Sequence, residues 1–400
     1  MKEAKVIDKC LLCGSSTVEI MDFGSTPLAN EFLTIPTKQD TFPLILHQCS
    51  ECQNVQINCI VDADRLFKHY LYEAGTSSVN VQHFNDYADK MADRHKLTYE
   101  DLVIDIGSND GTLLAAFKKK GYQTLGVDPA ANLVADANKK GIRTVEGFFT
   151  TKLAKELLPK CGKATLLTAN NIFAHAEDLH EIIEAVKLML TPTGTFVFEV
   201  SSFAAMVKNK LFDLVYHEHL FHHQVAPLIK FMSKHGMTLT DVEKIPNHGG
   251  SLRISCCRSN LGRETYQLKE EDIVTGKMIK AFGKDVLDLK GQLTSMLHEI
   301  HQSGKKISIY GFPAKATLLW NYFKINPLWV SSVYDDAALK QGRWIPGGTH
   351  IVKDPIGLYK ENPDYVLILG WNFADSIIKN HLNFNGKWII PLPNLEIKRT

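Results

Sequence analysis

Short apolar runs typical of buried strands recur through the middle of the chain, at 102–107, 122–128, 164–171 and 194–200. The segments between them, such as 112–121 and 179–190, place apolar residues at helical spacing. Alternation of buried strands with helices predicts a mostly parallel, doubly wound sheet. Two later apolar runs, 237–246 and 250–258, are joined by a turn too short for a crossover helix, which predicts an antiparallel pair at the sheet edge.

The flanks of this region follow other patterns. Residues 1–70 are irregular and contain prolines, whereas 263–301 repeat apolar residues at helical spacing, which predicts a linker helix. Beyond that helix, apolar runs and helical segments alternate again and predict a second, smaller α/β sheet. The sequence therefore predicts an α/β protein of three domains, at 1–70, 71–262 and 263–400.

Charge and composition narrow the choice of partner. The formal net charge is +1 without a run of like charges, which argues against nucleic acid or an anionic membrane and favours a small molecule. The N-terminus lacks the apolar core of a secretory signal, and we find no stretch of about 18 apolar residues for a membrane span. We expect a cytoplasmic protein.

Four of the eight cysteines form two C-x-x-C pairs, Cys10 with Cys13 and Cys49 with Cys52. Two such pairs in one short segment supply four thiolates for a tetrahedral Zn²⁺, and a filled coordination sphere indicates a structural metal. The alternatives are two disulfides or two redox pairs, which a reducing compartment and the lack of a βαβ pattern disfavour.

A glycine turn, "DIGSNDG", lies between a predicted strand and a predicted helix. Gly107 and Gly111 flank Asn109 there, and the spacing lacks the G-x-G-x-x-G that closes over a pyrophosphate. Asp105 ends the first strand, and Asp128 ends the next, where a carboxylate accepts from ribose hydroxyls. This combination indicates S-adenosylmethionine; the alternative is a tight βα turn without a ligand.

Polar residues follow the strand at 164–171. Asn170, Asn171 and His175 emerge at its carboxyl end, which is the side on which open α/β sheets bind ligands. The two asparagines alternatively only tie a turn.

The stretch "YHEHLFHH", 216–223, concentrates histidines. His219 and His223 at i, i+4 would share a helical face and bind a metal, or His219 alone would act as a base near neutral pH, or the stretch is a polar helix face. Spacing leaves these three readings open.

Two glycine-containing motifs offer further contacts. "NHGGSLR" brings a close backbone approach at Gly249 next to His248, Ser251 and Arg253, which suits a sugar or a diphosphate, or it is a hairpin turn. "YGFPAKATLL" places Lys315 after a strand-to-helix turn that suits a diphosphate, although a surface lysine beside an ordinary turn fits equally well.

The order of these motifs, from Cys10 nearly to the C-terminus, resembles that of the S-adenosylmethionine-dependent sugar C-methyltransferases. The resemblance also rests on "NNIFAH" and "QGRWIPGGTHI". It implies a zinc-binding domain, a class I methyltransferase core and a Rossmann-like third domain. It further implies methylation at C3 of a nucleotide-linked 4-keto-6-deoxy sugar, with dTDP as the expected nucleotide.

The resemblance also implies roles for individual residues. His219 would remove a proton from the sugar, Glu218 would orient the site, and Tyr216 would donate to a sugar oxygen or to the enolate. His175 and Asn171 would hold the keto sugar, and Tyr72 or its neighbour Tyr70 would line the edge of the site. Two other classes stay open: an NAD-dependent or epimerase-type nucleotide-sugar enzyme, and a non-catalytic, zinc-anchored binding protein with a degenerate methyltransferase fold.

Overall fold

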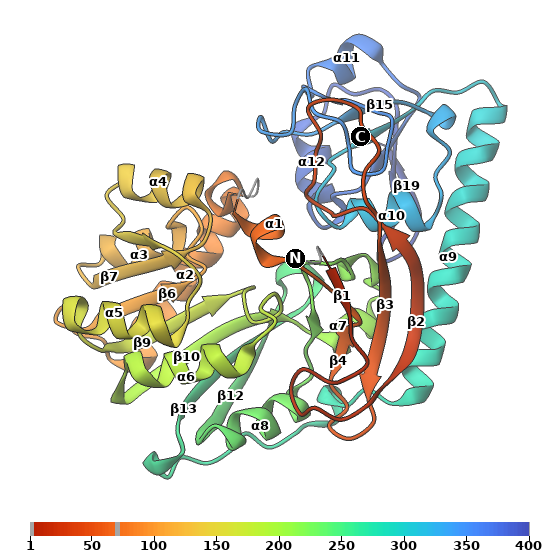
Figure 1. Ribbon diagram of the computed structural model, residues 1–400. Coiled ribbons are helices and arrows are strands. Elements are labelled where there is room, and N and C mark those ends of the chain that lie inside the picture. The colour runs from red at the N-terminus through yellow and green to blue at the C-terminus, as the bar shows by residue number, and fades with distance from the viewer. Residues whose placement is uncertain (1–3, 69–72, 400) are drawn as a thin grey trace.

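The computed structural model describes residues 4–68 and 73–399, and the side chain of His248 also lies outside the described atoms. Figure 1 shows a central α/β core, an N-terminal part built on long antiparallel strands, and a C-terminal α/β part, with a long helix running beside the last two. One cluster of buried apolar residues draws on all three parts and includes Leu44, Phe212 and Trp320. Each part therefore stabilises its neighbours.

The core is built on one sheet with the strand order β12-β13-β10-β9-β6-β7-β8. Its strands are β6 (Leu102–Ile106), β7 (Gln123–Asp128), β8 (Thr144–Glu146), β9 (Ala164–Asn170), β10 (Leu190–Ser201), β12 (Met237–Ile245) and β13 (Ser251–Arg258). The pairs among β6 to β10 are parallel, whereas β13 runs antiparallel to both β10 and β12. The predicted parallel sheet with an antiparallel edge pair is confirmed.

Helices cover both faces of this sheet. They are α2 (Ser78–His95), α3 (Thr112–Lys119), α4 (Ala131–Lys139), α5 (Thr151–Cys161), α6 (Leu179–Met189), α7 (Phe203–Lys208) and α8 (Val225–Lys234). Side-chain oxygens of Ser77, Thr150 and Asp178 cap the starts of α2, α5 and α6, where the first backbone N–H groups have no helical partner. Helix α2 packs on α3, and α5 packs on α6.

Strand order reverses between β6 and β9, which are neighbours in the sheet. From β6, the next strands along the chain, β7 and β8, are added toward one edge of the sheet. Strands β9 and β10, which follow them, are added on the other side of β6. The crevice at the carboxyl ends of strands on either side of such a reversal is where open α/β sheets bind ligands. Asp105, Asn170 and Asn171 lie at this crevice.

The N-terminal part contains β1 (Ala4–Val6) paired with β5 (Cys59–Val61), and a sheet with the order β11-β4-β3-β2. Its strands are β2 (Thr17–Thr26), β3 (Phe42–Cys49), β4 (Val55–Ile57) and β11 (Phe221–His222), and α1 (Ala63–Phe67) follows. Strand β11 comes from "YHEHLFHH", so this stretch is a turn followed by a short strand. The helical interpretation of it is wrong, because residues 221–222 pair with β4 instead.

The C-terminal part begins after a long helix, α9 (Gly276–Gln302), which the Thr275 hydroxyl caps. Residues 263–275 are not part of this helix, so the predicted helical start at 263 was too early. The sheet has the order β16-β15-β14-β17-β18-β19. Its elements are β14 (Ile307–Tyr310), α10 (Ala316–Tyr322), β15 (Val330–Tyr334), β16 (Val352–Lys353), α11 (Gly357–Glu361), β17 (Tyr365–Ile368), α12 (Ala374–Asn380), β18 (Lys387–Ile390) and β19 (Glu396–Arg399).

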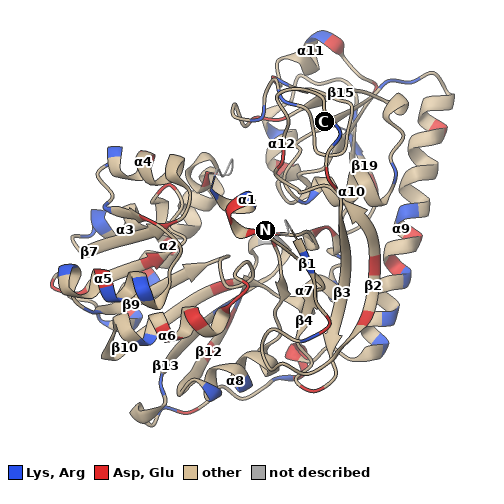
Figure 2. Cartoon of the chain, viewed as in Figure 1, with Lys and Arg blue, Asp and Glu red and all other residues tan. Residues whose placement is uncertain are grey.

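Charged residues of both signs are interspersed over every part of the chain in Figure 2. Within 4–68 and 73–399, none of the helices combines the length and apolar content that a bilayer crossing demands.

Candidate functional site

The four paired cysteines converge at one point of the N-terminal part. The Sγ atoms of Cys10 and Cys52 lie 3.6 Å apart, those of Cys13 and Cys49 lie 3.5 Å apart, and all four lie within 4.8 Å of one another. Thiolates on a tetrahedral Zn²⁺ at about 2.3 Å would be separated by about 3.8 Å, so the donor set fits this ion. The hydrogen bond between Cys10 and Cys52 lowers the pKa of the Cys10 thiol and raises that of Cys52, so Cys10 ionises first.

The glycine turn after β6 forms as its sequence predicts. Gly107 has φ +66 and its N–H donates to the Val127 carbonyl at 2.7 Å, which ties the turn to the end of β7. A Cβ on Gly107 would lie 2.2 Å from Cδ1 of Ile172, so only glycine fits between the turn and the segment that follows β9. Gly111, with φ +80, precedes the first residue of α3.

Two carboxylates lie beneath this turn. Asp128 accepts from the N–H groups of Asn109 at 2.8 Å and Ala130 at 2.9 Å, and burial raises its pKa. Asp105 is almost fully buried, and burial raises its pKa to about 7 although Thr168 donates a hydrogen bond to it at 2.6 Å. Carboxylates held at the ends of adjacent parallel strands suit the hydroxyls of a ribose and the cationic end of S-adenosylmethionine.

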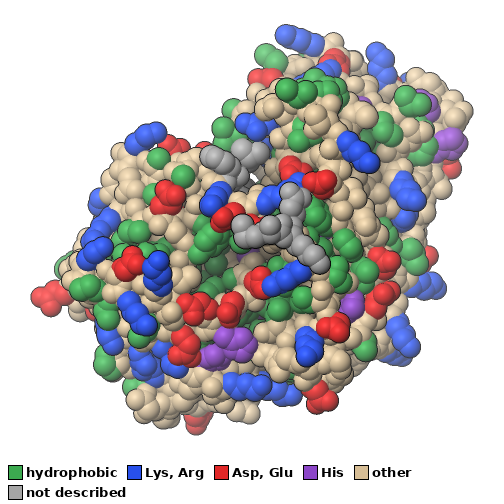
Figure 3. All heavy atoms as spheres, viewed as in Figure 1, with side chains coloured by type: hydrophobic (Ala, Val, Ile, Leu, Met, Phe, Trp, Pro, Cys, Tyr) green, Lys and Arg blue, Asp and Glu red, His purple; other side chains and the backbone are tan. Residues whose placement is uncertain are grey.

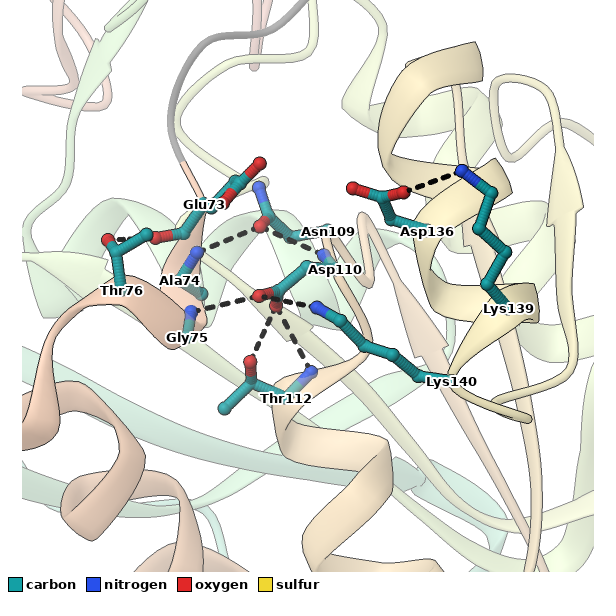
Figure 4. Close-up of polar contacts among 10 residues, drawn as sticks. All are labelled: Glu73, Ala74, Gly75, Thr76, Asn109, Asp110, Thr112, Asp136, Lys139 and Lys140. Atoms are coloured by element: carbon teal, nitrogen blue, oxygen red, sulfur yellow. Dashed lines mark hydrogen bonds and ion pairs between the residues drawn. The ribbon is translucent and has the colours of Figure 1, made fainter. Parts of the chain in front are cut away.

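The segment 73–77, which precedes α2, covers the far side of the turn (Figure 4). The N–H of Ala74 donates to Oδ1 of Asn109, and that of Gly75 donates to Oδ2 of Asp110, each at 3.0 Å. A Cβ on Gly75 would lie 2.6 Å from the same Asp110 oxygen. The side chain of Asn109 therefore bonds to the segment 73–77, whereas the backbone N–H of Asn109 bonds to Asp128.

Buried polar atoms at the carboxyl end of β9 have no hydrogen-bond partner within the described residues. They are both amide atoms of Asn170 and Nε2 of His175, and Oγ of Ser108 in the glycine turn is a further example. Unpaired buried polar groups are costly, so this set fits a polar ligand that would complete their hydrogen bonds. The backbone of Asn171, by contrast, turns the chain at φ +57 and donates to the Glu199 carbonyl at 2.8 Å.

His219 lies in the turn before β11 with both ring nitrogens engaged. Its Nδ1 lies 2.8 Å from the Leu214 carbonyl, and its Nε2 lies 2.9 Å from the Tyr216 hydroxyl. Because a carbonyl only accepts, Nδ1 must carry a proton, and in the neutral imidazole Nε2 then has a lone pair that accepts from Tyr216. This is the tautomer that a general base requires.

The segment after β9 brings His175 next to His219. The ring of His175 lies 5.0 Å from that of His219 and stacks on Phe67, the last residue of α1, at 5.6 Å. Burial lowers the pKa of His175 well below its usual value, so this imidazole is neutral. In Figure 3 the surface is hollowed between the core and the other two parts.

Glu218 is buried and receives a hydrogen bond from Nδ2 of Asn30 at 2.6 Å. Asn30 belongs to a loop of the N-terminal part that is also tied to the C-terminal part, where Thr317 donates to the Ala29 carbonyl at 3.0 Å. Elements from all three parts thus meet at the turn that carries Glu218 and His219.

The other histidines of the stretch have structural environments. His217 and His223 lie near the carbonyls of Pro43 and Phe173, at 3.1 and 2.9 Å, and burial lowers the pKa of each to about 4. Among the described residues, the only cluster of histidine, cysteine or carboxylate groups suited to a metal is the four-cysteine group. The second-metal reading of His219 and His223 therefore has no support, and both His217 and His223 are buried.

Several predicted substrate contacts have other partners. Arg253 is buried, its guanidinium bonds Glu199 at 2.6 Å and lies 4.1 Å above the Tyr87 ring, so it braces the sheet against α2. The Ser251 hydroxyl donates to the Asn247 carbonyl at 3.0 Å within its own turn.

Gly249 makes a close approach, but to protein: a Cβ there would lie 2.4 Å from Leu211 and 3.1 Å from Trp371. Lys315 is buried and donates to Asn372 at 2.6 Å. The alternative of a surface lysine beside an ordinary turn does not fit this buried position. Tyr70, Tyr72 and the side chain of His248 lie outside the described residues.

Sequence reasoning missed two groups at this site. Asn30 stands in a loop without any recognisable motif, and the Leu214 carbonyl is a backbone atom that carries no sequence signal. Only the fold brings them to Glu218 and His219.

The fold and the site define a class I methyltransferase with an N-terminal zinc-binding part. Three family models match consecutive stretches of the chain: "Putative zinc binding domain" at 10–67, "Methyltransferase domain" at 81–242 and "C-methyltransferase C-terminal domain" at 246–393. The C-methyltransferase NovU of Streptomyces niveus is 30% identical over 402 residues, which cover 97% of this chain and 96% of that protein. The chain belongs to the C-methyltransferase family and uses S-adenosylmethionine.

Solved structures align with less than half of the chain. Magnesium protoporphyrin IX methyltransferase of Synechocystis PCC 6803 is 15% identical, with a TM-score of 0.37 over 46% of this chain and 88% of that one. A methyltransferase of Clostridium acetobutylicum ATCC 824 is 14% identical, with a TM-score of 0.34 over 44% of this chain and 92% of that one.

Proposed function

We propose that this C-methyltransferase moves a methyl group from S-adenosylmethionine to C3 of a nucleotide-linked 4-keto-6-deoxy sugar, with dTDP as the nucleotide. The predicted domains at 1–70, 71–262 and 263–400 would divide the work into zinc binding, methyl transfer and nucleotide-sugar binding. We place the enzyme in the cytoplasm, because its zinc site needs cysteines that a reducing compartment keeps as free thiols.

The observation that supports a base-dependent reaction is the tautomer of His219. Its Nδ1–H is engaged by the Leu214 carbonyl, so Nε2 is the nitrogen that would receive a proton. Carbon is a poor nucleophile unless it is deprotonated next to a carbonyl, and a 4-keto sugar has such a hydrogen at C3.

The neighbouring side chains would stabilise the anion. Tyr216 donates to Nε2 of His219 without substrate, and we infer that its hydroxyl turns to the ketone oxygen when the sugar binds. Glu218, fixed by Asn30, would attract the imidazolium that forms. His175, Asn171 and Tyr72 would border the sugar, and Asn170, Asn109 and Asp128 the nucleoside. When bound, S-adenosylmethionine supplies an electrophilic methyl group on a sulfonium.

The test uses His219→Asn, which keeps a polar side chain but removes the titrating base. We expect methyl transfer to a dTDP-linked 4-keto-6-deoxy sugar, measured by mass spectrometry, to fall by roughly 10² to 10⁴-fold. Binding of S-adenosylmethionine, measured by calorimetry, should stay within about threefold of wild type, because His219 does not belong to the glycine turn.

Wild-type exchange of the C3 hydrogen in D₂O provides the second measurement. We expect exchange without added cofactor, and none in the His219 variant. Full turnover by that variant, or a product whose NMR spectrum places the new methyl group on oxygen, would contradict the proposal.

A further inference from the structure

A buried charged cluster lies where the C-terminal part meets the core. Asp213 has no exposed surface, and its Oδ2 accepts from the indole N–H of Trp371 at 2.6 Å. The Lys315 ammonium lies 3.9 Å from the same oxygen and 3.8 Å from the centre of the Trp371 ring, and it donates to Asn372 at 2.6 Å. We call Asp213, Lys315, Trp371 and Asn372 the interdomain cluster.

The interdomain cluster holds the turn on which the base depends. Asp213 is the middle residue of η2 (Phe212–Leu214), a single 3₁₀ turn, and Leu214 ends that turn. The Leu214 carbonyl is the acceptor that fixes the His219 tautomer. Only one peptide unit therefore separates the side chain held by the C-terminal part from the carbonyl that orients the base.

Apolar contacts bring the same two parts together. Phe212 stacks on Phe323, just after α10, with the ring centres 5.2 Å apart, and Gly249 packs against Leu211 and Trp371. These contacts attach η2 to the C-terminal part but do not fix its rotation. A directional hydrogen bond to Asp213 does fix it, because N–H···O bonds weaken steeply when they bend.

The buried charges indicate a purpose beyond stability. Taking a carboxylate and an ammonium out of water costs several kcal/mol per ion, and replacing such a pair with apolar residues is often neutral or stabilising. Oδ1 of Asp213 has no hydrogen-bond partner among the described residues, which adds to that cost. An arrangement of this kind specifies one register between two elements.

We propose that Asp213, Trp371 and Lys315 are positioning residues, which hold the Leu214 carbonyl against Nδ1–H of His219 and so keep Nε2 ready to accept a proton. The inference rests on the proposed function, because it presupposes that His219 is the base. It gives Lys315 a task other than binding a diphosphate. The C-terminal part would then act on the chemical step as well as on substrate binding.

The two roles of Lys315 predict different kinetics. A lysine that binds the diphosphate raises KM for the nucleotide sugar when it is replaced, whereas a positioning residue lowers kcat and leaves KM nearly unchanged. The cluster touches η2 and not the glycine turn, so affinity for S-adenosylmethionine should not change in either case.

The primary variant is Trp371→Phe, which removes the indole N–H and retains an aromatic ring. We expect kcat and the rate of C3 hydrogen exchange in D₂O to fall together by roughly 10 to 100-fold, with KM for the dTDP sugar within about threefold of wild type. Asp213→Asn, which retains the acceptor but removes the charge opposite Lys315, should cause a fall of the same kind. Trp388→Phe, the same change in the core of the same part, is the matched control and should leave the exchange rate of the folded enzyme unchanged.

Exchange without cofactor separates this inference from the function on which it rests. If His219→Asn still exchanges the hydrogen at the wild-type rate, the proposed base and the positioning both fail. If His219→Asn is inactive but Trp371→Phe exchanges at the wild-type rate, only the positioning is overturned. A higher KM with unchanged kcat in Lys315→Met would also overturn the positioning role, because Lys315 would then contact the substrate. If Asp213→Asn does not fold, the result for Trp371→Phe tests the positioning role by itself.

Discussion

The core and the C-terminal part each contain a glycine turn with almost the same hydrogen bonds. In the core, the Gly107 N–H donates to the carbonyl of the residue before Asp128, and Asp128 accepts from the N–H groups of Asn109 and Ala130. In the C-terminal part, the Gly311 N–H donates at 2.7 Å to the carbonyl of Tyr334, the residue before Asp335. Asp335 then accepts from Phe312 at 2.7 Å and from Ala337 at 2.9 Å.

The two turns differ in what surrounds the carboxylate. The Lys340 ammonium lies 3.2 Å from Oδ2 of Asp335 and also donates to the Phe312 carbonyl, and the Phe312 side chain is fully buried beside the turn. Among the described residues, no lysine or arginine pairs with Asp128 in this way. The same backbone geometry therefore gives Asp335 a cationic partner within the protein and gives Asp128 none among the described residues. A glycine turn followed by an aspartate at the end of the next strand can therefore form without a ligand. The side chains around the aspartate determine whether it is available to a nucleoside.

Paired glycine substitutions would test this difference most strongly. Gly107→Ala places a Cβ 2.2 Å from Ile172 in a left-handed backbone, so the turn must move, and we expect affinity for S-adenosylmethionine to fall by roughly 100-fold. Gly311→Ala, also at positive φ, meets only the Gly370 backbone nitrogen at 3.3 Å. It should lower thermal stability with little effect on cofactor affinity. Equal losses of affinity in calorimetry would show that both turns serve the cofactor.

Replacing the two acids gives a smaller effect. Asp128→Asn retains one acceptor but loses the charge, and we expect affinity for S-adenosylmethionine to fall by roughly 10 to 100-fold, since hydrogen bonds to charged groups contribute about 1.5–3 kcal/mol. Asp335→Asn should leave that affinity unchanged and lower the melting temperature, because Lys340 loses its partner. Unchanged affinity in the first variant would remove Asp128 from the cofactor site.

Much of the fold could be predicted from apolar periodicity alone. The alternation at 102–200 identified the parallel sheet, and the short connection between 246 and 250 identified the antiparallel pair β12 and β13. The helical start at 263 was wrong because periodicity cannot distinguish an extended segment that packs a few apolar residues from a helix. The stretch at 216–223 was undecided because strand β11 is defined by its partner β4, which lies far earlier in the chain and pairs Gln56 with Phe221.

The candidate site was predictable where chemistry is local. Cysteine pairs bind a metal at fixed spacing, and Gly107 with Asp128 follows a strand-turn-helix rule. The partners of Arg253 and Lys315 could not be predicted, because an arginine or lysine after a glycine looks the same in sequence whether its partner is a ligand or a buried Glu199 or Asp213. Partners that lie far apart along the chain are set by tertiary packing, which one sequence does not reveal.

The two turns also differ at the position two residues before Gly107 and Gly311. The core has Asp105 there, whereas the C-terminal part has the buried apolar residue Ile309. Burial raises the pKa of Asp105 to about 7, and the nearby charges of Asp128 and Glu199 act in the same direction. The folded, ligand-free protein therefore holds a proton there that the unfolded chain releases near pH 4, so its stability decreases as pH rises from about 4 to 7.

Binding of S-adenosylmethionine should have the opposite dependence on pH. The cofactor is cationic at its sulfonium, so it binds the ionised carboxylate better, and we expect its affinity to rise by about tenfold between pH 6 and pH 8. Asp105→Asn should remove this dependence, whereas Ile309→Val, a mild change at the corresponding position, should retain it. Calorimetric titration at several pH values gives the slope directly. A wild-type affinity that does not change over this range would mean that Asp105 keeps its proton beside the bound cofactor and acts there as a hydrogen-bond donor.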